Sequence, residues 1–442
     1  MRLIGRLEGG GLGAVLARGT AGIFAVKTAG LGLALAAEIV LTRLLGAESY
    51  GVYVQVIAWL AVLVVAAKMG QDAALVRYVS AYYAGREWGY LRGVIRHANR
   101  LVTALSLSLS LILALAVHAL GNILDHELKN AFLAGCFLLP LMSLLTLREA
   151  SIQALKRFVL AQVSSRILNH ILVALTAITA FTMLSGRFDG AVAVWCVVFA
   201  HSISVSTSSF WLRRSLPAQA RTSRPAYLSR QWLATGVGLL IVSGQYLIMN
   251  RIDILMLGPM AGKAVTGIYG AAVRLSWLVS FFLQTVSVIA APLISELYTS
   301  GRKEELQRLV RLVLHASALC SATVFGVLVL GGKFALGIFG PEFTAGYAAL
   351  TILAVAQLIN SLTGPSGFLL SMTGHERHYG VILFLSLLLN AFLNYILIPR
   401  YGMIGAAAAT AVANILMNGL SVVLIYRLLG IYSVFGLSRG KK

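Results

Sequence analysis

Residues 101–120 read LVTALSLSLSLILALAVHAL, a run of twenty residues that contains no Asp, Glu, Lys or Arg. As an α-helix such a run is about 30 Å long, which matches the hydrocarbon core of a bilayer. Comparable apolar runs recur along the whole chain, and short polar connections separate them. The sequence therefore predicts an integral membrane protein that crosses the bilayer many times as helices.

The composition supports this interpretation. Of the 442 residues, 59% are apolar and only 12% are charged, whereas charged residues make up about a quarter of a soluble domain. The connections between apolar runs are too short for a folded catalytic domain, which needs on the order of 50 residues. No nucleotide-binding or metal-binding motif is present, so we expect neither an enzyme nor a cofactor.

Twelve membrane-spanning helices are predicted, with both termini on the same side. Each is a run of mainly apolar residues: 18–44, 50–70, 98–120, 130–153, 161–184, 189–212, 231–258, 265–293, 307–331, 344–371, 379–399 and 403–428. The connection Gln71–Arg96 resembles an amphipathic helix lying at the membrane interface.

The positive charges predict the orientation. If both termini are cytoplasmic, 27 of the 36 Lys and Arg residues fall at cytoplasmic ends and 6 at outer ends. The remaining three, Lys27, Arg251 and Arg274, lie within the predicted spans. Because positive residues are retained in the cytoplasm, this imbalance explains the net charge of +21 without invoking nucleic acid.

A weak internal repeat divides the chain in two. A single shift aligns the halves without gaps and pairs identical residues, including Gly46 with Gly262 and Gly85 with Gly301. Six spans per half give a parallel repeat. We therefore expect a bundle at residues 1–212, a flexible basic cytoplasmic linker at 213–230, and a second bundle at 231–442 with a short cytoplasmic tail.

Ionisable side chains inside the spans are the candidate functional residues, because each costs about 2.5–3.5 kcal/mol to insert. Lys27 and Arg274 place cations at different depths, which suits an anionic group moving across the membrane. Arg251 is a third candidate for substrate binding. Asp253 and Glu38 are candidates for ion coupling. Structural ion pairs are the alternative interpretation for each of these residues.

Four segments of the chain resemble a known family. They are TRLLGAESYGVY (42–53), AALVRYVSAYYAGRE (73–87), NRIDILMLGPMAGKAVTGIYGAAVRL (250–275) and YGMIGAAAATAVAN (401–414). They are similar to the polysaccharide transporter family, the bacterial flippases of lipid-linked oligosaccharides within the multidrug/oligosaccharidyl-lipid/polysaccharide exporter superfamily.

The resemblance implies two six-helix bundles around a cationic cavity that opens alternately to either side. Its implied substrate is an undecaprenyl-pyrophosphate-linked oligosaccharide, which is moved from the cytoplasmic to the periplasmic leaflet for O-antigen, capsule or exopolysaccharide assembly. In this chain the basic groups of the first and eighth helices of such flippases correspond to Lys27 and Arg274. The seventh-helix Asp corresponds to Asp253. The implied location is the bacterial inner membrane, where polymerase and glycosyltransferases are possible partners.

Two alternatives stay open. A multidrug exporter of the same superfamily would need an acidic cavity, whereas cations predominate inside these spans. A membrane polysaccharide polymerase or ligase would need a large outer loop or a catalytic domain.

Overall fold

The structure is a computed structural model, and it describes residues 12–121, 123–184 and 188–435. Within these ranges all regular elements are helical and no strand occurs. In chain order the elements are α1 (Leu12–Lys68), α2 (Gln71–Ala84), α3 (Trp88–Ala119), α4 (His126–Ala154), α5 (Phe158–Gln162), the π-helix η2 (Val163–Leu168), α6 (Asn169–Met183), α7 (Gly190–Ser215), α8 (Ala218–Thr222), α9 (Ser229–Met249), α10 (Ile252–Ala261), α11 (Lys263–Thr299), α12 (Lys303–Phe339), the 3₁₀-helix η3 (Pro341–Gly346), α13 (Tyr347–Leu362), α14 (Ser366–Met372) and α15 (Glu376–Leu429).

The number of membrane spans follows from two interrupted helices. In the described ranges, ten helical segments are long and apolar enough to cross a membrane. Two of these contain a non-helical glycine: Gly46 (φ 68°, ψ 177°) in Phe24–Lys68, and Gly402 (φ 53°, ψ −130°) in Glu376–Leu429. Each half of these two segments exceeds the roughly 20 residues that a span requires. The chain is therefore an all-helical, multi-pass membrane protein with twelve spans, as predicted.

The connection Gln71–Arg96 differs from the prediction, because it contains two helices rather than one interfacial helix. α2 ends at Ala84 and α3 begins at Trp88. The side chains of Leu75, Tyr78 and Val79 are buried, and α2 packs against α3 and α4. Burial of this apolar face explains why the segment belongs to the helical core.

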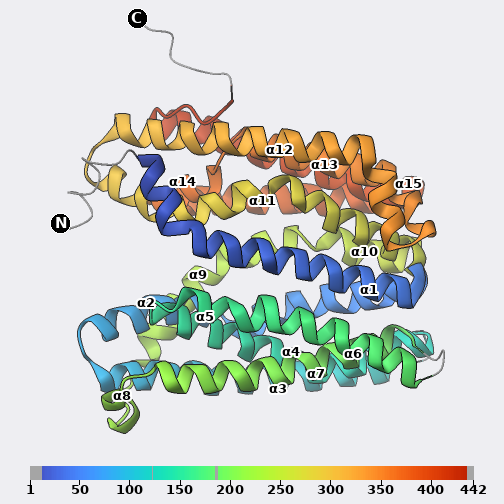
Figure 1. The fold of residues 1–442 in the computed structure, drawn as a ribbon, viewed down its shortest axis with the longest axis horizontal. Coiled ribbons are helices and arrows are strands. Elements are labelled where there is room, and N and C mark those ends of the chain that lie inside the picture. The colour runs from blue at the N-terminus through green and yellow to red at the C-terminus, as the bar shows by residue number, and fades with distance from the viewer. Residues whose placement is uncertain (1–11, 122, 185–187, 436–442) are drawn as a thin grey trace, which may run out of the picture. The chain divides into compact units, whose positions relative to one another are not determined.

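Contacts between helices divide the described residues into two compact units. One is Val26–Gly258, and the other combines Pro259–Lys442 with Met1–Ala25, as far as these are described. In Val26–Gly258, α4 packs against α3, α7 and α2 (Figure 1). In Pro259–Lys442, α11 packs against α12 and α13, and α13 packs against α15.

Four turns between helices share one backbone geometry. At the end of α2, the N–H of Arg86 donates to Tyr83 O and the N–H of Glu87 donates to Tyr82 O. This is the Schellman motif, which satisfies the last carbonyls of a helix and places one residue in the left-handed conformation. The same type of turn surrounds Lys156, Gly301 and Gly374, and all four central residues have positive φ.

These turns show the internal repeat in three dimensions. Gly46 and Gly262, which the shift aligns, share almost the same backbone conformation (φ 68° and 90°, ψ 177° and 169°). At the next turn, however, the structural equivalent of Arg86 is Gly301, whereas the same shift pairs Arg86 with Arg302. The predicted parallel repeat is therefore confirmed, but its gapless alignment is one residue out of register at this turn.

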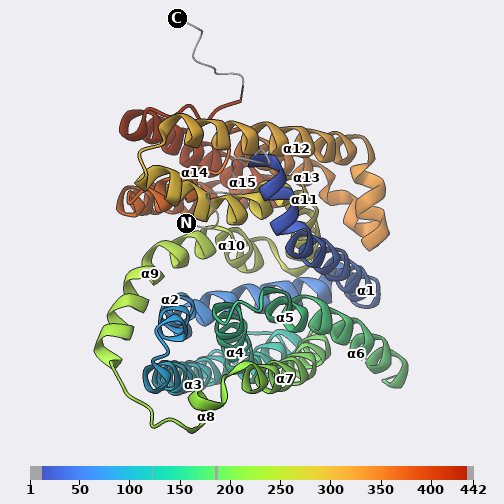
Figure 2. The same cartoon turned by 60° about the vertical axis from the view of Figure 1, so that its left-hand side comes forward.

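The linker at 213–230, predicted as a flexible segment, is instead packed against α3. The guanidinium of Arg92 donates to Ser223 O at 2.6 Å, and the N–H of Ala226 donates to Gly89 O at 3.0 Å. Gly93 allows this close approach, because an added β-carbon there would lie 1.7 Å from Ala226 O. Figure 2 shows the chain running from α7 through α8 to α9.

Trp232 fixes the start of α9 to the same core. Its side chain is fully buried, and its indole N–H donates to Tyr82 Oη at 3.1 Å. Tyr78 Oη lies 2.9 Å from Thr235 Oγ1 in the next turn of α9. The first two turns of the seventh span are thus joined to α2.

The segment after the twelfth span packs in a related way. Gln307 follows Gly301 by the same interval as Arg92 follows Arg86, so the two positions are equivalent in the repeat. Gln307 donates through Nε2 to Tyr432 O and accepts from the N–H of Tyr432. In both halves, therefore, a side chain in the first turns of the third helix holds the backbone that follows the sixth helix.

The Schellman turns give a prediction about stability. An alanine at Gly301 or Gly374 would meet no atom within 4 Å, so the left-handed φ is the only cost. We expect Gly301→Ala and Gly374→Ala each to lower the free energy of unfolding by about 1 kcal/mol. Lys156→Gly should relieve the equivalent strain and therefore raise the free energy of unfolding. Thermal unfolding of the purified protein in detergent measures both effects.

Gly326→Ala is the matched control, because Gly326 lies inside α12 and an added β-carbon there also meets open space. This change should stabilise the protein by up to about 1 kcal/mol, since alanine is the better helix former. Equal effects at positions 301, 374 and 326 would contradict the strain argument.

Candidate functional site

The seventh span is broken at Asn250 and Arg251, between α9 and α10. The Asn250 side chain donates to Tyr246 O at 2.6 Å, and the N–H of Arg251 donates to Ile248 O at 2.9 Å. The break therefore satisfies part of its own backbone. Arg251, a predicted substrate-binding residue, lies in this break and is half-buried.

Asp253, a predicted ion-coupling residue, lies in the first turn of α10. Its carboxylate accepts from the N–H of Ile254 at 2.8 Å, and its side chain is only 3% exposed. A carboxylate in this position is stabilised by the positive end of the helix dipole. The sequence NRID thus places a buried acid directly after a helix break.

Glu38, the second predicted ion-coupling residue, is held by a tyrosine across the Gly46 turn. Tyr50 Oη donates to the carboxylate of Glu38 at 2.5 Å, and both side chains are buried. Tyr50 also stacks on Tyr53 with ring centroids 5.8 Å apart. This hydrogen bond links the two spans of α1 across the Gly46 turn.

Arg274, a predicted substrate-binding residue, lies on α11 in the unit that contains Pro259–Lys442. Its side chain is half-buried, and the guanidinium carbon lies 5.6 Å from the centre of the Trp277 ring. Arginine stacked over an aromatic ring keeps its charge while part of its surface is shielded.

Lys27 lies on α1 in the other unit, where it belongs to a group of charged side chains. Arg166 is close enough to act electrostatically on its ammonium group. Arg166 in turn acts on the carboxylate of Glu149, which also senses Lys68 and Asp72. These five residues, Lys27, Lys68, Asp72, Glu149 and Arg166, are called the charged cluster below.

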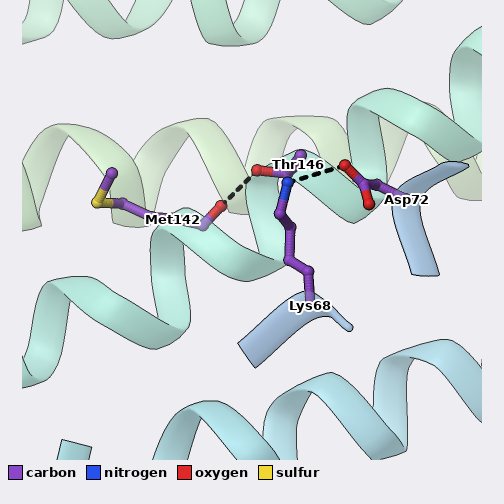
Figure 3. A network of polar contacts seen from close by, with 4 residues as sticks. All are labelled: Lys68, Asp72, Met142 and Thr146. Carbon is purple, nitrogen blue, oxygen red and sulfur yellow. Dashed lines mark hydrogen bonds and ion pairs between the residues drawn. The ribbon is translucent and has the colours of Figure 1, made fainter. Parts of the chain in front are cut away.

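The charged cluster contains one ion pair of short range. Lys68 Nζ lies 2.8 Å from Asp72 Oδ2 (Figure 3). The same figure draws Thr146, whose hydroxyl donates to Met142 O. Both members of the pair are mostly buried, with side chains 15% and 29% exposed. Three cations and two carboxylates thus gather on α1, α2, α4 and η2.

Sequence reasoning misses four members of the charged cluster. It assigns Arg166 and Lys68 to the cytoplasmic ends of the chain and Asp72 to a surface helix. It does not single out Glu149 within the predicted span 130–153. An acid and a base inside neighbouring predicted spans, Glu149 and Arg166, are the signal that points to this site.

Asparagine side chains on α15 bond along their own helix. Asn394 Nδ2 donates to Asn390 Oδ1, and Asn418 Nδ2 donates to Asn414 O. Each bond joins residues four apart on α15, which is the spacing of neighbours on one helix face.

Comparisons with known proteins identify relatives over most of the chain. Residues 16–298 match the family described as polysaccharide biosynthesis protein, and residues 239–396 match the MatE family. The probable low-salt glycan biosynthesis flippase Agl15 of Haloferax volcanii is 24% identical over 408 residues, which cover 90% of this chain and 81% of that protein.

Solved structures share the fold at low identity. An inward-facing multidrug resistance transporter of the MATE family has a TM-score of 0.75 at 13% identity, covering 90% of this chain and 94% of that one. The lipid II flippase MurJ in an inward closed conformation has a TM-score of 0.69 at 13% identity, covering 92% and 87%. The match over residues 16–298 agrees with the sequence motifs, the fold and the repeat. The chain therefore belongs to the polysaccharide biosynthesis protein family of the multidrug/oligosaccharidyl-lipid/polysaccharide exporter superfamily.

Proposed function

We propose that this protein is a flippase for lipid-linked oligosaccharides rather than an enzyme. The observation that carries the proposal is the excess of cations in the charged cluster, in which Lys27 and Arg166 lie within spans and Lys68 ends the second span. Charges in hydrocarbon are costly, so they are expected where a polar or charged ligand passes. A phosphate-bearing lipid with a polar glycan is such a ligand, and the name of the relative Agl15 agrees with it.

The finer assignment rests on the family resemblance. The substrate would be an undecaprenyl-pyrophosphate-linked repeat unit, and the pathway would be the assembly of lipopolysaccharide O-antigen, capsule or exopolysaccharide. The distribution of Lys and Arg supports cytoplasmic termini and hence a route from the cytoplasmic to the periplasmic leaflet of the inner membrane. Glycosyltransferases would supply the lipid-linked unit, and a polymerase would consume it.

Transport would proceed by alternating access, with bundle 1–212 rocking against bundle 231–442. The linker 213–230, which is packed on α3, would move with the first bundle. Lys27 would bind the pyrophosphate before Arg274, because Lys27 lies nearer the predicted cytoplasmic side. Arg251 would contact the substrate at the break in the seventh span.

For ion coupling, Asp253 is the stronger of the two proposed carboxylates. It is buried beside a helix break, and discontinuous helices bind substrates and ions in many transporters. Glu38 is already bonded to Tyr50, so a coupling role would require this hydrogen bond to break during transport.

The proposed function predicts a specific defect in cells that lack the protein. The lipid-linked oligosaccharide should accumulate in the cytoplasmic leaflet, and surface polysaccharide should be lost. Extraction and mass analysis of lipid-linked intermediates measures the first effect. Sensitivity to cationic dyes with normal surface polysaccharide would instead favour a multidrug exporter.

Substitutions of the substrate-binding cations test the site. Lys27→Ala and Arg274→Ala should each reduce surface polysaccharide at least tenfold, because a charge-assisted phosphate contact contributes about 1.5–3 kcal/mol. Lys27→Arg should retain most of the function, and Lys27→Glu should be worse than Lys27→Ala through repulsion. Arg377→Ala, which removes an exposed cation, is the control. Normal function of a normally expressed Lys27→Ala protein would refute this assignment.

Asp253→Asn tests ion coupling while it preserves the size of the side chain. We expect transport into proteoliposomes to lose its response to an imposed proton or sodium gradient, although substrate binding is retained. Tyr50→Phe, which removes the partner of Glu38, should lower stability but leave the gradient response. An Asp253→Asn protein that still responds to the gradient would exclude Asp253 as the coupling residue.

A further inference from the structure

The neighbourhood of Lys27 contains a second cation that nothing in the sequence pattern assigned to the site. Lys27 and Gly30 lie three residues apart on α1 and therefore share a helix face. On that face Gly30 approaches Arg166 closely, because a β-carbon added at Gly30 would lie 3.0 Å from Arg166 Cβ and 3.7 Å from its Cδ. The absence of a side chain at Gly30 lets the two cations approach one another.

Arg166 belongs to the π-helical stretch Val163–Leu168, which interrupts the fifth span between α5 and α6. Such stretches are rare and frequently occur at functional sites. Arg166 is exposed, although it lies within a segment long and apolar enough to span the membrane. Its position thus combines an unusual backbone with an exposed charge inside an apolar span.

The charges around this pair do not cancel. Lys68 is bound to Asp72 at 2.8 Å, which leaves Glu149 as the carboxylate that acts on Arg166. The charged group that acts on Lys27 is Arg166, a second cation. Like charges held together in a span need a compensating anion, and a diphosphate group supplies two negative charges to such a pair.

We infer that Arg166 is a substrate-binding residue, which together with Lys27 holds the diphosphate of the lipid-linked substrate, and that Glu149 is the internal carboxylate that competes with this ligand for Arg166. The inference rests on the proposed function. It adds the fifth span to the binding site and explains why a carboxylate lies within an otherwise cationic group.

Binding of inorganic pyrophosphate to the purified full-length protein in nanodiscs tests the pair. Arg166→Gln and Lys27→Gln should each weaken binding about tenfold or more. The double variant should lose less than the product of the two single losses, because both side chains contact the same ligand. Arg157→Gln, which removes an exposed cation from the nearby turn, is the control and should bind as the parent does.

Two further variants separate binding from folding. Glu149→Gln should tighten pyrophosphate binding severalfold, an effect that damage to the fold would not produce. Gly30→Val should weaken binding without any change of charge, because it pushes α1 away from Arg166. Gly32→Val is its control, since an added β-carbon at Gly32 meets no atom within 4 Å.

The outcomes distinguish this inference from the proposed function. If cells lacking the protein accumulate the lipid-linked unit but Arg166→Gln binds pyrophosphate and restores polysaccharide as the parent does, the inference is wrong and the function stands. If Arg166 and Lys27 bind pyrophosphate jointly but no lipid-linked glycan accumulates, the binding pair is supported and the proposed function is wrong. Weaker binding in Glu149→Gln would overturn the role of Glu149 as a competitor.

Discussion

Hydrocarbon offers no hydrogen-bond partner, so each backbone amide and carbonyl within the membrane must be satisfied by the protein itself. Helices meet this requirement residue by residue, and at several described departures from helix another group bonds to the backbone. Schellman bonds close the ends at Arg86 and Gly301. At the break in the seventh span the Asn250 side chain and the Asp253 carboxylate bond to the backbone themselves. The break in the seventh span therefore coincides with polar side chains that bond to the freed backbone.

The same constraint explains how far the fold was predictable. Apolar runs of about twenty residues have few alternatives to crossing the membrane, so the twelve spans followed from the sequence. The register of the repeat did not follow, because the left-handed position of the Schellman turn is Gly301 in one half and Arg86 in the other. An alignment by identity pairs Gly301 with Gly85, whereas the backbone pairs it with Arg86. The packing of the linker on α3 also escaped prediction, since it depends on the absence of side chains at Gly89 and Gly93.

The sequence predicts a site made of charged side chains within the spans, but not which residues gather there. A charge inside an apolar span is conspicuous, and this feature predicts Lys27, Glu38, Arg251, Asp253 and Arg274 as candidates. Glu149 and Arg166 lie within two or three helical turns of a polar connection, where charged residues are ordinary. Only the three-dimensional packing shows that Arg166 lies beside Lys27 and that Glu149 acts on Arg166. The hydrogen bond of Glu38 to Tyr50 is likewise invisible in the sequence, because it joins two spans across the Gly46 turn.

Incomplete neutralisation would distinguish the proposed binding site from a structural ion pair in this protein. Lys68 and Asp72 form a pair at 2.8 Å in which each charge has its partner, and such a pair gains nothing from a ligand. Lys27 and Arg166 act on one another as like charges, and Glu149 acts on Arg166, an arrangement that would cost stability until an anion binds. A second carboxylate there would stabilise the empty protein and weaken its hold on a phosphate. A site without any carboxylate would bind the anion more tightly and release it more slowly. A single acid beside Arg166 would be a compromise between these limits, because a transporter must both bind its substrate and release it.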